Sequence, residues 1–172
     1  DSATLTNVTL SGNTAAWGGG ICIQSTGVVT MVGVAIVGNT ALQSGGGLYQ
    51  YLGDIALDRS VILSNTASYA GGGLDLSYGS ATLVNTVVAD NQTSYVGSGL
   101  YLYGASARLL HTTIARNTGG DGSRIYVAPG GDFGLRGPQA VLADSTVALT
   151  NTILTGHSVG VTATAGVTVT LN

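Results

Sequence analysis

The stretch Leu10-Ser-Gly-Asn13-Thr-Ala-Ala-Trp-Gly-Gly-Gly20 decides the fold, because the chain repeats its pattern at a fixed interval. An aliphatic residue, an asparagine three positions later and a glycine cluster return as IVGNTALQSGGG (36–47), ILSNTASYAGGG (62–73) and VADNQTSYVGSG (88–99). The asparagines, each 26 residues from the next, are Asn13, Asn39, Asn65, Asn91 and Asn117. Such a period is typical of a solenoid, in which each repeat forms one structural unit that stacks on its neighbours.

A short run of alternating residues follows each glycine cluster and predicts a half-buried strand. The runs are ICIQ, LYQY, LDLS, LYLY and, after Gly122-Ser-Arg124, IYVA. We expect the first residue of each run to face inward: Ile21, Leu48, Leu74, Leu100 and Ile125. We expect the second residue of each run to face outward: Cys22, Tyr49, Asp75, Tyr101 and Tyr126. Two further strands are predicted at residues 3–6 and 8–12 of the first coil and at the equivalent positions of the others.

Together these features predict an all-β fold, a right-handed single-stranded parallel β-helix with about six coils and three strands per coil. Stacked coils turn equivalent aliphatic residues into interior columns. These columns explain how a chain with only 8% charged residues can have a mean hydropathy of +0.38. No run approaches the roughly 18 continuous apolar residues that a transmembrane helix needs, so we expect no membrane span.

The asparagine column is expected to be a structural ladder. An asparagine at a bend can adopt unusual backbone angles, and its amide can bond the amides of adjacent coils, at about 1 kcal/mol per bond. After Asn117 the next matching segment is NTILTGH (151–157), which puts His157 on the ladder in place of an amide. That spacing contains 14 additional residues, which predict a protruding loop at 128–140 of a single domain that spans 1–172.

Composition excludes several classes of protein. With a net charge of −3 and five lysine and arginine residues, the chain has no electrostatic footprint for nucleic acid. A single cysteine allows no intrachain disulfide, and we expect neither a cofactor nor a metal site. The chain begins and ends within the repeat, so we expect it to be a piece of a longer array. Its open coil ends would then favour end-to-end self-association.

The repeat resembles that of the polymorphic outer-membrane proteins, which carry FxxN and GGA-[ILV] motifs. The matching stretches, within residues 1–127, are LSGN and GGGI, IVGN and GGGL, ILSN and GGGL, and VADN and GSGL. An aliphatic residue replaces the phenylalanine of the family motif, and glycine replaces its alanine. The resemblance implies a bacterial adhesin-type passenger, secreted or displayed on the cell surface, and it does not specify a ligand.

Parallel β-helices also include polysaccharide lyases and glycoside hydrolases, so a fragment of such an enzyme is the alternative function. Glycoside hydrolysis requires two carboxylates at one cleft. Asp54 and Asp58 lie on one coil without acidic neighbours above or below, and Asp75 and Asp90 lie on different strands. We therefore expect no catalytic residues.

Aromatic residues mark one side of the predicted rod. Five tyrosines occupy outward positions of the strand after the glycines, and three further aromatic residues lie in the loop that leads into it. The candidate binding face consists of Trp17, Tyr49, Tyr51, Tyr69, Tyr95, Tyr101, Tyr103 and Tyr126. We expect a non-catalytic extracellular segment, a stalk or passenger, that binds a carbohydrate or a partner protein through this face. Alternatively, the rings only stabilise a glycine-weakened sheet by cross-strand stacking.

Overall fold

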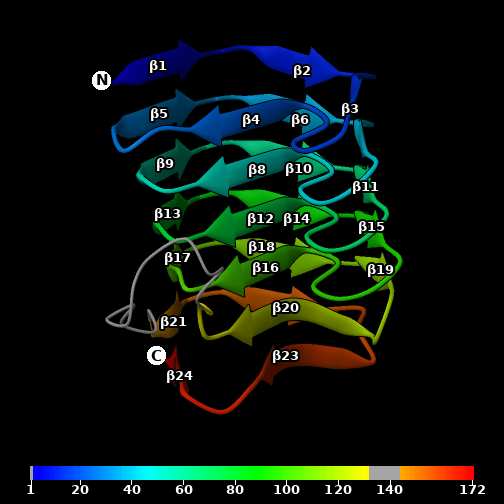
Figure 1. The fold of residues 1–172 in the computed structure, drawn as a ribbon, viewed down its shortest axis with the longest axis vertical. Coiled ribbons are helices and arrows are strands. Elements are labelled where there is room, and N and C mark those ends of the chain that lie inside the picture. Colours follow the sequence, from blue (N-terminus) through cyan, green and yellow to red (C-terminus); the bar gives the residue numbers. More distant parts are fainter. Residues whose placement is uncertain (1, 132–143) are drawn as a thin grey trace.

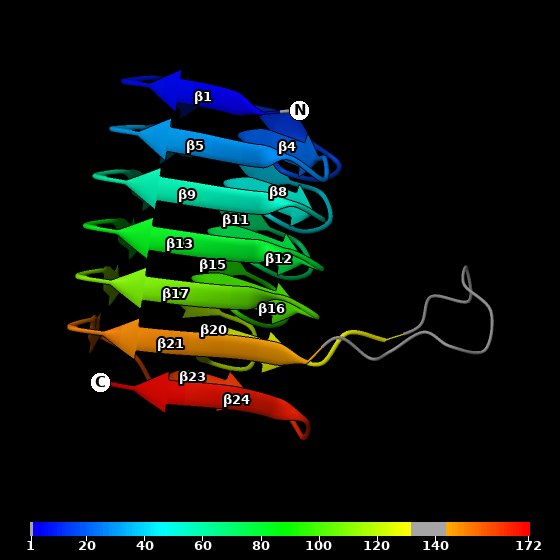
Figure 2. The same cartoon turned by 90° about the vertical axis from the view of Figure 1, so that its left-hand side faces the viewer.

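The chain winds in about six turns around one axis, and equivalent strands of successive turns pair in parallel (Figure 1). The computed structural model describes residues 2–131 and 144–172, which contain strands and no helix. The predicted fold class, an all-β parallel β-helix, is confirmed. Seen from the side, the coils stack as nearly level layers (Figure 2).

Four sheets are formed by the described residues. The seven-stranded sheet consists of β1 (Ala3–Thr6), β5 (Val28–Val32), β9 (Asp54–Asp58), β13 (Ser80–Val84), β17 (Ser106–Leu110), β21 (Ser145–Thr150) and β24 (Val167–Leu171). The second sheet consists of β2 (Thr9–Ser11), β6 (Ala35–Val37), β10 (Val61–Leu63), β14 (Val87–Ala89), β18 (Thr113–Ala115) and β22 (Ile153–Thr155). The short-strand sheet consists of β3 (Thr14–Ala15), β7 (Thr40–Ala41), β11 (Thr66–Ala67), β15 (Gln92–Thr93) and β19 (Thr118–Gly119). The tyrosine sheet consists of β4 (Ile21–Gln24), β8 (Leu48–Tyr51), β12 (Leu74–Ser77), β16 (Leu100–Tyr103), β20 (Ser123–Ala128) and β23 (Val159–Ala163).

A complete coil therefore has four strands, where the sequence predicts three. The additional strand is the pair of residues that follows each ladder asparagine, as in Thr40–Ala41. Two residues are too few to show alternation, so sequence periodicity cannot reveal this strand. The predicted strand at 8–12 is also shorter in the structure, where β2 covers Thr9–Ser11.

Aliphatic columns fill the interior of the rod. Leu48, Leu74, Leu100 and Ile125 are completely buried and aligned in register, as predicted for the inward position of the tyrosine sheet. Burial of a side chain of this size stabilises the fold by about 1.5–3 kcal/mol. A shift of one residue would move a whole column to the solvent, so the hydrophobic pattern fixes the register of each strand.

The corners of each coil use residues with left-handed backbone angles. One corner register has φ between 47° and 62° and comprises Asn7, Gly33, Arg59, Asn85, His111 and Asn151. A second has φ between 52° and 71° and comprises Gly12, Gly38, Ser64, Asp90, Arg116 and Gly156. The second register directly precedes the ladder. The expectation that the ladder asparagines themselves adopt unusual angles is therefore wrong: the residue before each of them makes the bend.

The ladder itself bonds three coils at each step. Asn65 donates from Nδ2 to Asn91 Oδ1 (3.0 Å) and also to the carbonyl oxygen of Ile36 (2.9 Å). Its own Oδ1 accepts from both the backbone N–H (2.9 Å) and the side-chain amide (3.0 Å) of Asn39. The same amide-to-amide bond recurs from Asn13 through Asn117, which confirms the predicted ladder.

The glycine clusters and the ladder depend on each other. A Cβ atom at Gly73 would lie 2.6 Å from the Gly99 oxygen and 3.1 Å from Asn91 Nδ2. Gly20, Gly47 and Gly99 stand in the same relation to the asparagine of the next coil. The third glycine of each cluster therefore leaves the space that the next asparagine amide occupies, which explains why the repeat contains both.

His157 continues the ladder with a changed partner. Its Nε2 contacts the carbonyl oxygen of Ile114 at 2.9 Å, as Asn117 Nδ2 contacts that of Val88. Its Nδ1 accepts a hydrogen bond from Arg124 Nε at 2.9 Å, and Arg124 stands where earlier coils have the third glycine. The imidazole thus takes the place of the amide, as predicted, and makes the same contact with a backbone carbonyl oxygen. A hydrogen bond from Arg124 takes the place of the amide-to-amide bond.

The predicted loop at 128–140 is described only at its start. Ala128 ends β20, and residues 132–140 lie outside the described residues. Gly131 donates its backbone N–H to the Tyr103 hydroxyl (2.7 Å) and accepts a bond from the Tyr78 hydroxyl at its carbonyl oxygen. Two tyrosines therefore anchor the beginning of the inserted segment.

Replacement of Asn65 by alanine should destabilise the rod strongly. The change leaves the buried Asn39 N–H and Ile36 carbonyl without their partner, and each such group costs about 1–3 kcal/mol. We expect the free energy of unfolding in urea to fall by about 3 kcal/mol. Asn13→Ala, in the same register of the exposed first coil, is the matched control and should cost about 1 kcal/mol. Equal losses for the two variants would contradict this role of the ladder.

His157 should make stability depend on pH. Burial, and to a smaller extent the charge of Arg124, lower the pKa of His157 below its usual 6.5. As the pH falls, the unfolded chain binds the proton before the folded chain does. The contribution of His157 to stability is therefore complete above about pH 6.5 and declines below it. The double variant His157→Asn, Arg124→Gly, which restores the ladder residue and the glycine beside it, should reduce this decline in urea unfolding curves recorded between about pH 7.5 and 5; an unchanged slope would argue against it.

Candidate functional site

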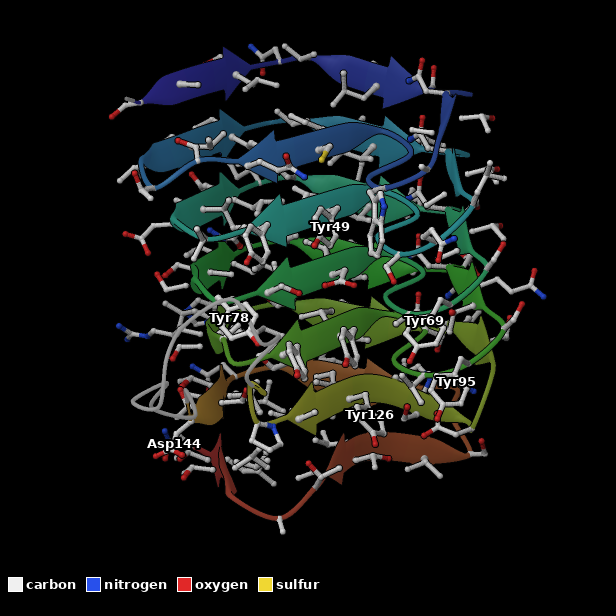
Figure 3. All side chains as sticks on the ribbon, viewed as in Figure 1. Tyr49, Tyr69, Tyr78, Tyr95, Tyr126 and Asp144 are labelled. Carbon is white, nitrogen blue, oxygen red and sulfur yellow. The ribbon has the colours of Figure 1, made fainter. Side chains whose placement is uncertain are left out.

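The aromatic side chains gather on the outer face of the tyrosine sheet and on the loops beside it (Figure 3). Six of the eight residues predicted for the binding face line one groove: Trp17, Tyr49, Tyr51, Tyr69, Tyr101 and Tyr103. The other two lie beside it. Tyr95 stacks on Tyr69 at 5.1 Å between ring centroids, and Tyr126 stacks on Tyr101 at 5.9 Å.

The strand register explains why a groove forms. Asp75 pairs with Tyr49 on one side and Tyr101 on the other, and Ser77 pairs with Tyr51 and Tyr103 in the same way. The coil of β12 therefore presents a carboxylate and a hydroxyl where both neighbouring coils present tyrosine rings. The resulting gap has a volume of about 330 Å³.

Loops contribute the remaining residues that line this gap. Trp17, Ser44 and Tyr69 come from the segments that lead into the tyrosine sheet, and Trp17 packs on Tyr49 at 5.0 Å between ring centroids. Tyr78 comes from the corner after β12, with a φ of 53°. Its ring meets the edges or faces of Tyr51 (5.9 Å) and Tyr103 (5.4 Å) at nearly right angles.

Tyr78 was not predicted as part of the aromatic face. It follows the alternating run LDLS and occupies a corner, where the inward–outward pattern no longer applies. Its position in the sequence could have indicated its place, because it directly follows Ser77, the last residue of a strand on the tyrosine side.

Asp75 forms the floor of the groove. Its side chain points outward from the sheet, as predicted, yet the residue is only 3% exposed, because it lies at the bottom of the groove between the rings on either side. Ser77 Oγ donates to its Oδ1 at 2.9 Å, and the Ser44 hydroxyl provides a further hydrogen bond. Burial raises the pKa of this carboxyl to about 7, although both hydroxyls lower it. A carboxyl that titrates near neutrality in a groove is a typical feature of functional sites.

The tyrosines beside Asp75 remain neutral. Burial, together with the nearby Asp75 carboxylate, raises the pKa of Tyr49 to about 12 and also raises the pKa of Tyr101. Their hydroxyls are therefore available as hydrogen-bond donors throughout the physiological range. Asp75 is the one carboxylate among the described residues that line the groove.

Three other acids of the described chain have partners away from the groove. Asp90 forms a two-pronged ion pair with Arg116 (2.8 and 2.7 Å), and Asp58 pairs with Arg59 at 2.5 Å. Asp54 accepts a bond from the Ser80 hydroxyl.

No cluster of three or more histidine, cysteine, aspartate or glutamate residues is found within 2–131 and 144–172. The same ranges contain no helix that is long and apolar enough to cross a membrane.

Comparison with known proteins identifies the fold family. The family model described as the right handed beta helix region matches residues 1–172. The chain belongs to this family. No curated protein and no solved structure matches the chain significantly. The β-helix family contains both enzymes and non-enzymes, so the function has to be inferred from the groove.

Ionisation of Asp75, at the floor of the groove, should make the protein less stable as the pH rises. The pKa of Asp75 is raised from 3.8 to about 7, so the folded chain retains a proton that the unfolded chain loses. The contribution of Asp75 to stability is complete below about pH 4 and decreases until the pH exceeds about 7. In urea unfolding, Asp75→Asn should remove this decrease and be more stable than the wild type at about pH 8. Asp58→Asn, which removes a half-buried carboxylate outside the groove, is the control; equal pH slopes for the wild type and Asp75→Asn in this window would refute the assignment.

Proposed function

We propose that the chain is a non-catalytic segment of an extracellular bacterial surface protein and binds a glycan in the groove between the tyrosine rows. The single observation that carries this proposal is the gap at Asp75 and Ser77, with tyrosines on the coils at either side. Tyrosine rings provide apolar faces for the C–H surface of a sugar, and their hydroxyls provide hydrogen bonds at the rim. Aromatic anchors of this kind are favoured at interfaces.

Two structural features support a glycan over the purely structural role of the tyrosines. Stacking alone would be served best by an unbroken tyrosine column, yet Asp75 interrupts the column between Tyr49 and Tyr101. Its burial raises the free energy of the folded state at neutral pH, so the interruption destabilises the apo protein. A site that costs stability is expected where binding is selected.

The alternative function is a fragment of a polysaccharide lyase or hydrolase. The raised pKa of Asp75 favours it, since general acids share this property. Glycoside hydrolysis nevertheless uses a second carboxylate at about 5–9.5 Å, and Asp75 is the one carboxylate among the described residues of the groove. We therefore prefer binding without turnover. Release of reducing ends or unsaturated products from a bound polysaccharide would favour the enzyme.

The extracellular location is inferred from the likeness of the repeat to surface passengers. LSGN with GGGI and ILSN with GGGL resemble the motifs of the polymorphic outer-membrane proteins. A rod of stacked coils can act as a stalk and can display the tyrosine sheet along one side (Figure 1). Both properties suit an adhesin-like role.

Glycan binding should be lost when the groove tyrosines are removed. Tyr49→Ala and Tyr101→Ala each delete one wall, and loss of such a ring contact should weaken binding of an oligosaccharide identified on a glycan array about tenfold. Tyr95→Ala, which removes an exposed ring outside the groove, is the matched control and should bind as the wild type does. Circular dichroism verifies that all three variants are folded. Unchanged binding by the Tyr49 and Tyr101 variants would leave the tyrosines with a structural role only.

A further inference from the structure

Resting on the proposed glycan-binding role, we propose that the groove recognises an amino sugar, with its ammonium group on the Asp75 carboxylate between the rings of Tyr49 and Tyr101. The preferred ligands are therefore sugars with an unacetylated amine, and neutral and acidic sugars bind less well.

The groove has the width that such a group requires. Asp75 lies directly opposite Tyr49 on β8 and Tyr101 on β16, so the two wall strands are two coil spacings apart, about 9.6 Å. A ligand group in van der Waals contact with both walls needs about 7–8 Å between them. One sugar substituent therefore fits above the carboxylate, with an aromatic ring on either side.

Within residues 2–131 and 144–172, the described part of the chain, no cationic side chain is paired with this carboxylate. The residues that face it are Tyr49, Tyr101, Tyr51, Tyr103, Ser77 and Ser44, and none of these carries a positive charge. Of the chain's five basic residues, which are all arginines, Arg59 and Arg116 are held by Asp58 and Asp90, and Arg124 is held by His157. Arg108 lies on β17 of the seven-stranded sheet, and the fifth lies outside the described residues. Buried carboxylates are normally paired with a cation, and a ligand ammonium would complete this pair.

The aromatic walls favour a cation for a second reason. The faces of tyrosine rings attract ammonium groups, by about 0.5–1 kcal/mol at exposed sites and by 2 or more where water is excluded. Tyr49 and Tyr101 remain uncharged because their pKa values are raised. Repulsion by Asp75 and by the ring faces would reject a uronic acid, while an N-acetyl group would leave the buried carboxylate without a counter-charge.

Proton linkage follows from the same contacts. A bound ammonium stabilises the ionised form of Asp75, so binding displaces the proton that this carboxyl, with a pKa of about 7 in the apo protein, holds near neutrality. The groups that face Asp75 from the adjacent strands and loops are tyrosine and serine hydroxyls, and the thiol of Cys22 stands one position further along the same column beyond Tyr49. The pKa of that thiol is raised by burial, so Asp75 carries the titration.

The test compares oligosaccharides that differ only at nitrogen. Isothermal titration calorimetry should show that the wild type binds a β-1,4-linked glucosamine oligomer at least tenfold more tightly than its N-acetylated counterpart. Asp75→Asn should bind both oligomers with equal affinity, and Asp58→Asn, the matched loss of a carboxylate outside the groove, should keep the preference. Equal affinity of the wild type for both oligomers would overturn the inference and leave the glycan role intact. Failure of the wild type to bind any oligosaccharide would overturn both.

A second measurement needs no variant. An N,N,N-trimethylated glucosamine oligomer keeps its charge at every pH, so its affinity reports on Asp75 alone. We expect this affinity to fall about tenfold between pH 8 and pH 6, as a carboxyl with a pKa of about 7 takes up its proton. An affinity that does not change over this range would show that the ammonium group does not meet Asp75.

Discussion

Amide-to-amide hydrogen bonding along the ladder is the constraint on which the rest of the rod depends. Asn39, Asn65 and Asn91 each bond to the preceding and the following coil, so the distance between coils and the position of the residues along them are set together. The third glycine of each cluster exists to admit this amide. Once ladder and glycine are in register, the aliphatic columns and the four sheets follow, because every strand already lies opposite its equivalent one coil away.

Strict register also determines what the outer surface can do. Outward residues of equivalent strands form columns, and a change at one position of one repeat alters one level of a column without disturbing the interior. The groove arises in this way. Leu74 and Leu76 of β12 continue the inward columns, while Asp75 and Ser77 replace two outward tyrosines. The site is therefore a local departure from the repeat on an unchanged scaffold.

Features that repeat could be predicted from the sequence, and features that depend on one coil could not. The spacing of the asparagines and the alternation after the glycines predicted the fold, the inward columns and the side on which the aromatics gather. The burial of Asp75 was missed because alternation indicates direction only, and this outward side chain lies at the bottom of a groove between rings from the coils above and below. Tyr78 was missed because it occupies a corner, where alternation stops.

The pair of Arg124 and His157 shows how the ladder constrains even its exceptions. Histidine cannot offer the amide oxygen that accepts two bonds from the preceding asparagine, so a ladder that changes to histidine loses these bonds. A residue at the position of the third glycine compensates for the lost bonds. This position can hold a larger side chain here, because the imidazole fills a different space than the amide does. Arg124 fills this position and donates to His157 Nδ1, and its Nη1 donates to Ser98 Oγ at 3.2 Å. Arg124 and His157, 33 residues apart in the sequence, therefore depart from the repeat together, because their side chains occupy the same space between two coils. Outward residues can vary freely only where they share no such space with a neighbouring coil.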